Sequence, residues 1–259
     1  MRISLPILAL LILSISIQGC NSPSFNTSDK GLANADSLFL GFYLGMAQKD
    51  FFDHCTELNK QQKITQGPGG TTSVEHKIKG TYGGDVSMRF FPTFIKKEMF
   101  EMPVTYTYDS WAPWNKEYSS AALLPKILES YKAIYGGDFK VVNDRYQGKI
   151  YYRMDGKRRI NLFIKDEQFV QAIFTDMEVE ERLKEEFEKT AMKIQGSGWA
   201  YLARDGKIKT IVNHEIRKDI AMLIDWWEHA WALDYQSDKK SYLANQWKII
   251  NWNIIDARL

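Results

Sequence analysis

The spacing of apolar residues predicts an α+β fold that begins with a helix followed by strands. Apolar positions recur at helical spacing over 38–59 and place Phe51, Phe52, Cys55 and Leu58 on one face. A Gly-Pro-Gly-Gly sequence then breaks the pattern at 67–70. Alternating or β-branched and aromatic runs follow and predict strands over 74–78, 86–91 and 104–108.

The same order repeats further along the chain. A second helix is predicted over 121–135, capped by Ser119 or Ser120 and ended by Gly136-Gly137. Asp155-Gly156 is a typical hairpin turn. Further strands are predicted over 139–142, 149–154, 159–164 and 168–174. The repetition predicts two similar units, each a helix followed by an antiparallel sheet.

From residue 178 the pattern changes. A charged segment predicts a helix over 178–195, with Leu183, Phe187 and Met192 as its apolar stripe, ended by Gly196-Ser197-Gly198. A tryptophan-rich helical tail closes the chain. Between them, strands are predicted over 199–205, 207–213 and 221–225.

The N-terminal 20 residues have the proportions of a secretion signal. Arg2 precedes an apolar run that is too short to span a membrane as a helix. The end of this segment, Gln18-Gly19-Cys20, resembles the lipobox of bacterial lipoproteins, which implies removal of residues 1–19 and a lipid on Cys20 that anchors the chain in the bacterial cell envelope. An ordinary secretion signal or an uncleaved anchor is the alternative. The polar residues 20–36 are expected to form a flexible tether.

The length of 259 residues suits two domains, which we place at 37–177 and 178–259. A formal net charge of +2 provides no broad field for nucleic acid, so we expect no nucleic-acid partner. Two cysteines exclude a disulfide framework and a cysteine-rich metal site. Four histidines leave few candidates for any site that needs several imidazoles.

The first domain shows no phosphate loop, metal-ligand spacing or nucleophile elbow. Its segments NKQQKITQG, WAPWNK and MDGKRRI are similar to small lipoproteins of the Bacteroidetes type. That resemblance carries no function with it. The aromatic residues Tyr106, Tyr108, Trp111 and Trp114 either line a ligand surface or form one face of a sheet with its loop cover.

The segment from Asp225 to His229 contains the most specific candidate site. If a strand ends at Asp225 and a helix starts before His229, both side chains can reach one metal ion. A carboxylate oxygen combined with an imidazole nitrogen suits iron or manganese. The surrounding tryptophans are expected to form a dry wall around the ion.

The segments GSGWAYL, DWWEHAWALDYQ and SYLANQWKIINWNIIDARL resemble the C-terminal α/β domain of iron/manganese superoxide dismutases. The resemblance implies a three-stranded antiparallel sheet with helices, and superoxide as the substrate, converted to oxygen and hydrogen peroxide. It implies that Asp225 and His229 are metal ligands and that Trp227 lines the active site. By the same resemblance, Glu228 bridges to a partner subunit in a homodimer, and His214 is a candidate hydrogen-bond partner of metal-bound solvent.

Two further ligand histidines of that family have no counterpart in residues 37–177. The segment HCTELNK at 54–60 is only weakly similar to the segment that carries the first of them. Ala232 replaces an expected interface tyrosine, and Lys239-Lys240-Ser241 replaces an expected Arg-Pro pair. Three hypotheses therefore remain open. The chain is a lipid-anchored dismutase, an inactive surface lipoprotein that carries a dismutase half-domain, or a fused or mis-assembled chain.

Overall fold

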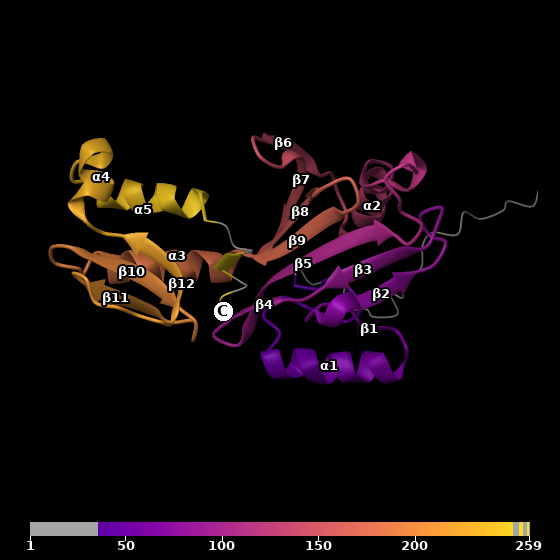
Figure 1. The fold of residues 1–259 in the computed structure, drawn as a ribbon, viewed down its shortest axis with the longest axis horizontal. Helices are drawn as coiled ribbons and strands as arrows, with labels where there is room; N and C mark the ends of the chain where they lie inside the picture. The colour runs from indigo at the N-terminus through magenta and orange to yellow at the C-terminus, as the bar shows by residue number, and fades with distance from the viewer. Residues whose placement is uncertain (1–35, 251–253, 256–257, 259) are drawn as a thin grey trace, which may run out of the picture.

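Two successive units of a helix followed by antiparallel strands form the larger part of the molecule (Figure 1). The computed structural model describes residues 36–250, 254–255 and 258. The first unit contains α1 (Gln48–Lys60), β1 (Thr65–Gln66), a 3-10 turn (Pro68–Gly70), β2 (Val74–Ile78), β3 (Val86–Phe90), β4 (Thr93–Ile95) and β5 (Glu98–Tyr108). The second contains a 3-10 turn (Lys116–Tyr118), α2 (Ser120–Tyr135), β6 (Lys140–Asp144), β7 (Gly148–Asp155), β8 (Arg158–Ile164) and β9 (Val170–Asp176).

The last strands of the two units join them into one nine-stranded sheet. β5 and β9 pair antiparallel, from Glu101 opposite Thr175 to Tyr106 opposite Val170. The strand order is β1-β2-β3-β5-β9-β8-β7-β6, with β4 paired to β5 outside this path. The predicted repetition is therefore present, but its strands form a single sheet because pairing of the two final strands leaves no edge between the units.

The first predicted helix is too long at its N-terminal end. Residues 36–47 form turns and isolated bridges, and α1 begins only at Gln48. Gly41 and Gly45 adopt positive φ values of 83° and 81°, which a right-handed helix does not allow. The apolar spacing arises because the turns themselves bury Leu38, Phe42 and other apolar side chains in the main core.

The second helix agrees with its prediction. The Ser119 side chain accepts a hydrogen bond from the Ala122 N–H, and Gly136 ends the helix at a φ of 74°. α2 packs on the centre of the sheet, where Leu123, Ile127 and Tyr131 are buried. This layer of helix on sheet forms the core of the first domain.

The C-terminal part is a second, smaller α/β unit, drawn in orange and yellow in Figure 1. As predicted, it contains a three-stranded antiparallel sheet, and the strand order is β11-β10-β12. α3 ends earlier than expected, so Met192 lies beyond the helix and is exposed, while Ala191 is buried in its place. The elements are α3 (Met177–Ala191), β10 (Gly198–Ala203), β11 (Ile208–Val212), β12 (Ile220–Asp225), α4 (Glu228–Tyr235) and α5 (Lys239–Lys248).

The second hydrophobic core extends into the hairpin of β4 and β5. Ile95 and Phe100 of that hairpin are buried together with Leu183 and Phe187 of α3. An ion pair of 2.7 Å between Lys96 and Glu186 lies at the same junction. The small unit is therefore packed against the first sheet as well as joined to it through the chain.

The four aromatic residues considered as a ligand surface are divided between interior and solvent. Tyr106 and Tyr108 are buried, and the Tyr106 hydroxyl lies 2.8 Å from that of Tyr131. Trp114 is exposed, with 85% of its surface accessible. The first two side chains therefore belong to the core, as in the alternative of one sheet face with a loop cover.

The predicted signal at 1–19, the lipidation site Cys20 and nearly all of the tether lie outside the described residues. Within the described residues, no helix has the length and apolar character needed to cross a membrane.

Candidate metal centre

The junction of β12 and α4 brings Asp225 and His229 together. Asp225 is the last residue of β12 and pairs with Trp199 on the central strand of the small sheet. Its main-chain carbonyl also accepts a hydrogen bond of 2.8 Å from the Tyr242 hydroxyl on α5. His229 follows in the first turn of α4. The change from strand to helix between the two residues turns both side chains to the same side.

The distance between the two side chains suits a shared metal ion. Nε2 of His229 lies 3.2 Å from Oδ2 of Asp225. Two donors that each lie about 2.0–2.2 Å from one ion are themselves separated by roughly 3 Å. The other carboxylate oxygen, Oδ1, accepts the Trp227 N–H at 2.8 Å and fixes the orientation of the carboxylate. The pair can therefore supply one oxygen and one nitrogen ligand.

A third donor is missing from the described part of the chain. No group of three or more histidine, cysteine, aspartate or glutamate residues is close enough there to hold a metal ion. All four histidines of the chain belong to the described residues. His54 hydrogen-bonds to the Leu40 carbonyl at 2.7 Å and His76 to the Lys63 carbonyl at 2.6 Å, both within the first domain. The described residues of one chain thus bring two, and not four, protein ligands together at this position.

The His229 side of the pair is open to solvent, whereas the sequence predicted a dry wall of tryptophans. His229 exposes 70% of its side chain. Trp226 and Trp231 are buried in the second core, where the Trp231 Nε1–H donates to the Trp226 carbonyl. Trp227 lies beside His229, with its ring centre 6.1 Å from the imidazole, and Trp199 lies opposite Asp225 on the neighbouring strand. The dry wall does not form because most of the tryptophan surface is used in packing α4 and α5 against the small sheet.

This geometry belongs to a segment with known relatives. Residues 165–258 match the C-terminal domain of iron/manganese superoxide dismutases. An iron superoxide dismutase of Pyrobaculum aerophilum is 33% identical over 88 residues, which are 30% of this chain and 42% of the relative. A manganese/iron superoxide dismutase of Porphyromonas gingivalis is 36% identical over 86 residues, 30% of this chain and 45% of the relative. An iron superoxide dismutase of Bacteroides fragilis is 34% identical over 97 residues, 34% of this chain and 50% of the relative.

The chain spans about half the length of these curated relatives. The match begins at residue 165 and therefore includes β9 of the large sheet, upstream of the domain boundary that we placed at 178. The matches cover 42% to 50% of each of these three relatives. The similarity accounts for the small α/β unit and leaves the N-terminal domain unexplained.

The other residues suggested by the dismutase resemblance lie near the pair or on its helix. His214 follows Asn213, which has a φ of 54°, in the exposed connection between β11 and β12. Its ring centre lies 5.2 Å from that of Trp227. Glu228 is exposed in the first turn of α4. Their roles toward bound solvent and toward a partner subunit stay predictions.

The face of α4 that carries His229 is uncovered in the described structure. Leu233 lies one helical turn after His229, on the same face, and is 91% exposed. Ile216, two residues after His214, is 85% exposed. The exposed side of the pair thus lies next to an exposed apolar side chain, Leu233, on α4.

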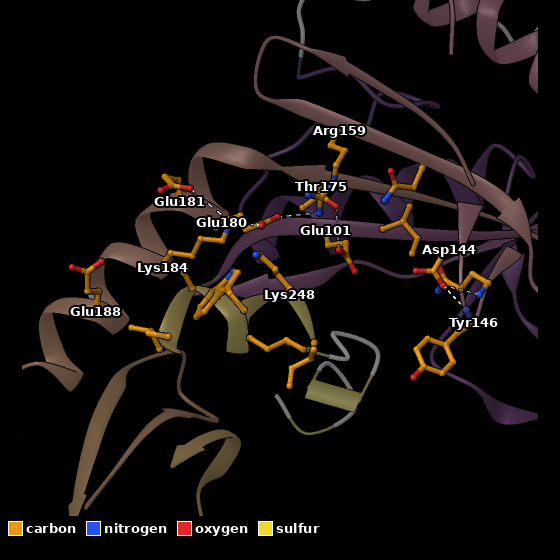
Figure 2. A pocket seen from close by; sticks show the side chains of 18 of the residues that line it. Glu101, Asp144, Tyr146, Arg159, Thr175, Glu180, Glu181, Lys184, Glu188 and Lys248 are labelled. Carbon is orange, nitrogen blue, oxygen red and sulfur yellow. Dashed lines mark hydrogen bonds and ion pairs between the residues drawn. The ribbon is translucent and has the colours of Figure 1, made fainter. Parts of the chain in front are cut away.

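The sequence gives no signal for a cavity of about 1130 Å³ between the large sheet and the C-terminal helices (Figure 2). Polar side chains that line the cavity form ion pairs and hydrogen bonds with one another. The buried Glu180 carboxylate accepts from Arg159 at 3.0 Å and from Lys184 at 2.8 Å. The Thr175 hydroxyl donates to the buried Glu101 carboxylate. Residues from four strands, two helices and neighbouring connections line this cavity, so no local motif could have revealed it.

Proposed function

We propose that this chain is a lipid-anchored envelope protein whose dismutase-type domain does not dismutate superoxide by itself. The observation that carries the proposal is the two-donor site. Asp225 and His229 converge, and the described chain brings no further histidine to them. Two ligands bind a divalent ion weakly and do not fix the coordination geometry that sets a redox potential. The function is therefore one of binding or structure, with the dismutase fold serving as a packed module.

The geometry gives the pair a role that needs no metal. The Asp225 carboxylate receives the Trp227 N–H at the start of α4 and holds His229 through its second oxygen. These two contacts tie the last residue of β12 to the N-cap residue and the first turn of α4. The pair thus fixes the connection between β12 and α4.

The activity test uses the purified full chain after incubation with iron or manganese and removal of unbound ion. We expect the unaltered chain to remove superoxide no faster than an equal amount of the His229→Ala variant treated in the same way. The variant is the matched control because it removes the imidazole from an exposed position. A rate at least tenfold higher for the unaltered chain, lost in His229→Ala, would establish a dismutase and overturn the proposal.

A dismutase would need two more imidazoles, and this chain has none in place. Superoxide as substrate and a homodimer through the Glu228 surface belong to that second candidate function. The 33% to 36% identity to dismutases over the C-terminal unit is the observation in its favour. The activity test above decides between the two functions.

The proposed anchor is tested separately. The end of the signal, Gln18-Gly19-Cys20, supports acylation of the Cys20 thiol, which then holds the chain at a membrane. We expect Cys20→Ser to move the chain from the membrane fraction to the soluble fraction, whereas Cys55→Ser leaves it in place. Membrane retention of the Cys20→Ser chain would contradict the anchor.

A further inference from the structure

β6 forms an open edge of the nine-stranded sheet. It pairs with β7 alone, whereas the opposite end of the sheet is the two-residue strand β1. All five residues of β6, Lys140–Asp144, are exposed. Figure 1 shows β6 at the top of the molecule, away from the small sheet. Within the described residues, its outer N–H and C=O groups have no strand to pair with, which is the usual starting point for strand addition.

The sequence of β6, Lys-Val-Val-Asn-Asp, is complementary to itself when it runs antiparallel. Lys140, Val142 and Asp144 share one face because side chains alternate along a strand. If two copies pair with Val142 opposite Val142, Lys140 of each copy lies opposite Asp144 of the other. Directly opposite side chains on a sheet face are about 4.5–5.5 Å apart at Cβ, within reach of an ion pair.

Both charged residues are available for this contact. Lys140 makes no ion pair or side-chain hydrogen bond with the other described residues. Oδ1 of Asp144 accepts the N–H groups of Tyr146 and Gln147, each at 2.8 Å, which leaves Oδ2 for a partner. These two backbone hydrogen bonds also lower the pKa of Asp144, so the carboxylate stays charged.

The exposed apolar residues of β6 also favour pairing with a second strand. Val141 is 50% exposed and Val142 is 48% exposed, and they lie on opposite faces of the sheet. Isolated edge strands normally carry charges that discourage pairing. Here pairing would cover a valine on each face and would turn the edge lysine into part of an ion pair.

We propose that β6 pairs with β6 of a second copy of this chain, antiparallel and centred on Val142, so that two nine-stranded sheets join across a two-fold axis. This surface is distinct from the Glu228 surface suggested by the dismutase resemblance. Five residues a side bury less than the roughly 1,200 Å² of a stable interface. The association is therefore reversible and depends on concentration.

The test is sedimentation velocity of the full chain over a range of concentrations, with Cys20→Ser in every sample so that no lipid drives association. We expect the sedimentation coefficient to rise with concentration. Lys140→Glu and Asp144→Lys each place like charges opposite one another at both contacts, so each should weaken self-association at least about tenfold. Lys149→Glu lies on β7 and not on the open edge strand. It changes the net charge by the same amount as Lys140→Glu and should behave like the parent chain.

Sedimentation of an equimolar mixture of the two charge variants is the most specific part of the test. A mixed pair restores opposite charges at both contacts, so the mixture should associate more strongly than either variant does alone. Circular dichroism checks that each variant is folded. If Asp144→Lys fails this check because it loses the turn contacts to Tyr146 and Gln147, the comparison of Lys140→Glu with Lys149→Glu decides.

Three results would overturn the proposal. The first is a parent chain that stays monomeric at every concentration. The second is a folded Lys140→Glu variant that associates as strongly as the parent. The third is a mixture of two folded charge variants that stays monomeric. A dimer that is lost in Glu228→Lys and retained in Lys140→Glu is a case of the second result and would place the interface on the C-terminal domain.

Discussion

At the scale of single residues, Asp225 shows how a side chain can match a metal-ligand motif and still act as a structural group. Oδ1 accepts the Trp227 N–H, Oδ2 faces His229, and the main-chain carbonyl accepts from Tyr242. The proximity of Asp225 and His229 could be predicted from their four-residue spacing across a strand end. The incomplete ligand set was also expected, because the two further ligand histidines of the dismutase family have no counterpart in residues 37–177, and within the described residues no third ligand joins the pair.

Replacing Asp225 measures this structural role. Asp225→Ala removes both side-chain contacts and should lower the free energy of unfolding by about 1–2 kcal/mol. Asp225→Asn keeps an oxygen for the Trp227 N–H and should lose less than half as much. Asp234→Ala, at an exposed position on α4, is the control and should stay within about 0.5 kcal/mol of the parent. Urea unfolding measures all three, and equal losses for the alanine and asparagine variants of Asp225 would contradict the assigned contact.

Cys55 provides a second test at this scale. Burial raises the pKa of its thiol to about 11, above its ordinary value of 9.0. Because the folded-state pKa is the higher one, the neutral thiol is favoured by folding, and stability should fall as pH rises from 9 toward 11.

The same shift makes the thiol unreactive. In a Cys20→Ser background, alkylation of Cys55 by iodoacetamide at pH 8 should be on the order of a hundredfold slower in the folded chain than in urea, because the thiolate is the nucleophile. Mass spectrometry gives both rates. Similar rates in the two conditions would show that Cys55 is not shielded as the structure has it.

At the scale of elements, α2 and most of the strands followed from residue patterns, whereas β1, β4, the first part of β5 and the segment before α1 did not. Apolar periodicity predicted helix over 38–59 because buried turns can place apolar residues at the same intervals as a helix face. Gly41 and Gly45 hold the backbone in a conformation that periodicity does not detect. The tryptophan-rich tail was predicted as helical, and the structure divides it between α4 and α5.

A pair of glycine substitutions tests the turns before α1. Gly41 has a φ of 83°, and an added Cβ would lie 2.9 Å from Nε2 of His54. Gly70 has a φ of 67° with open space around it. Gly70→Ala should cost about 1–2 kcal/mol from backbone strain alone. Gly41→Ala should cost more, because it also displaces the His54 ring from the Leu40 carbonyl. Thermal unfolding compares them, and an equal or smaller loss for Gly41→Ala would contradict the packing of His54 on this turn.

At the scale of the whole molecule, the pairing that joins the two repeated units into one sheet could not be predicted from the sequence pattern. Pairing of β5 with β9 links residues about 70 positions apart, and a local pattern does not indicate which strands will be neighbours. The burial of Ile95 and Phe100 in the second core is equally non-local. The dismutase-type unit therefore packs against a sheet domain that has no counterpart in the matched part of its relatives.

We propose that one chain carries an Asp225–His229 half-site and not a complete iron or manganese centre, because the described residues bring no third ligand to the pair. The most direct measurement is the metal content of the purified full chain after incubation with each ion and gel filtration, compared with His229→Ala. We predict well below one ion per chain, with no difference between the parent and the variant. One iron or manganese ion per chain, retained through gel filtration and lost in His229→Ala, would contradict the claim.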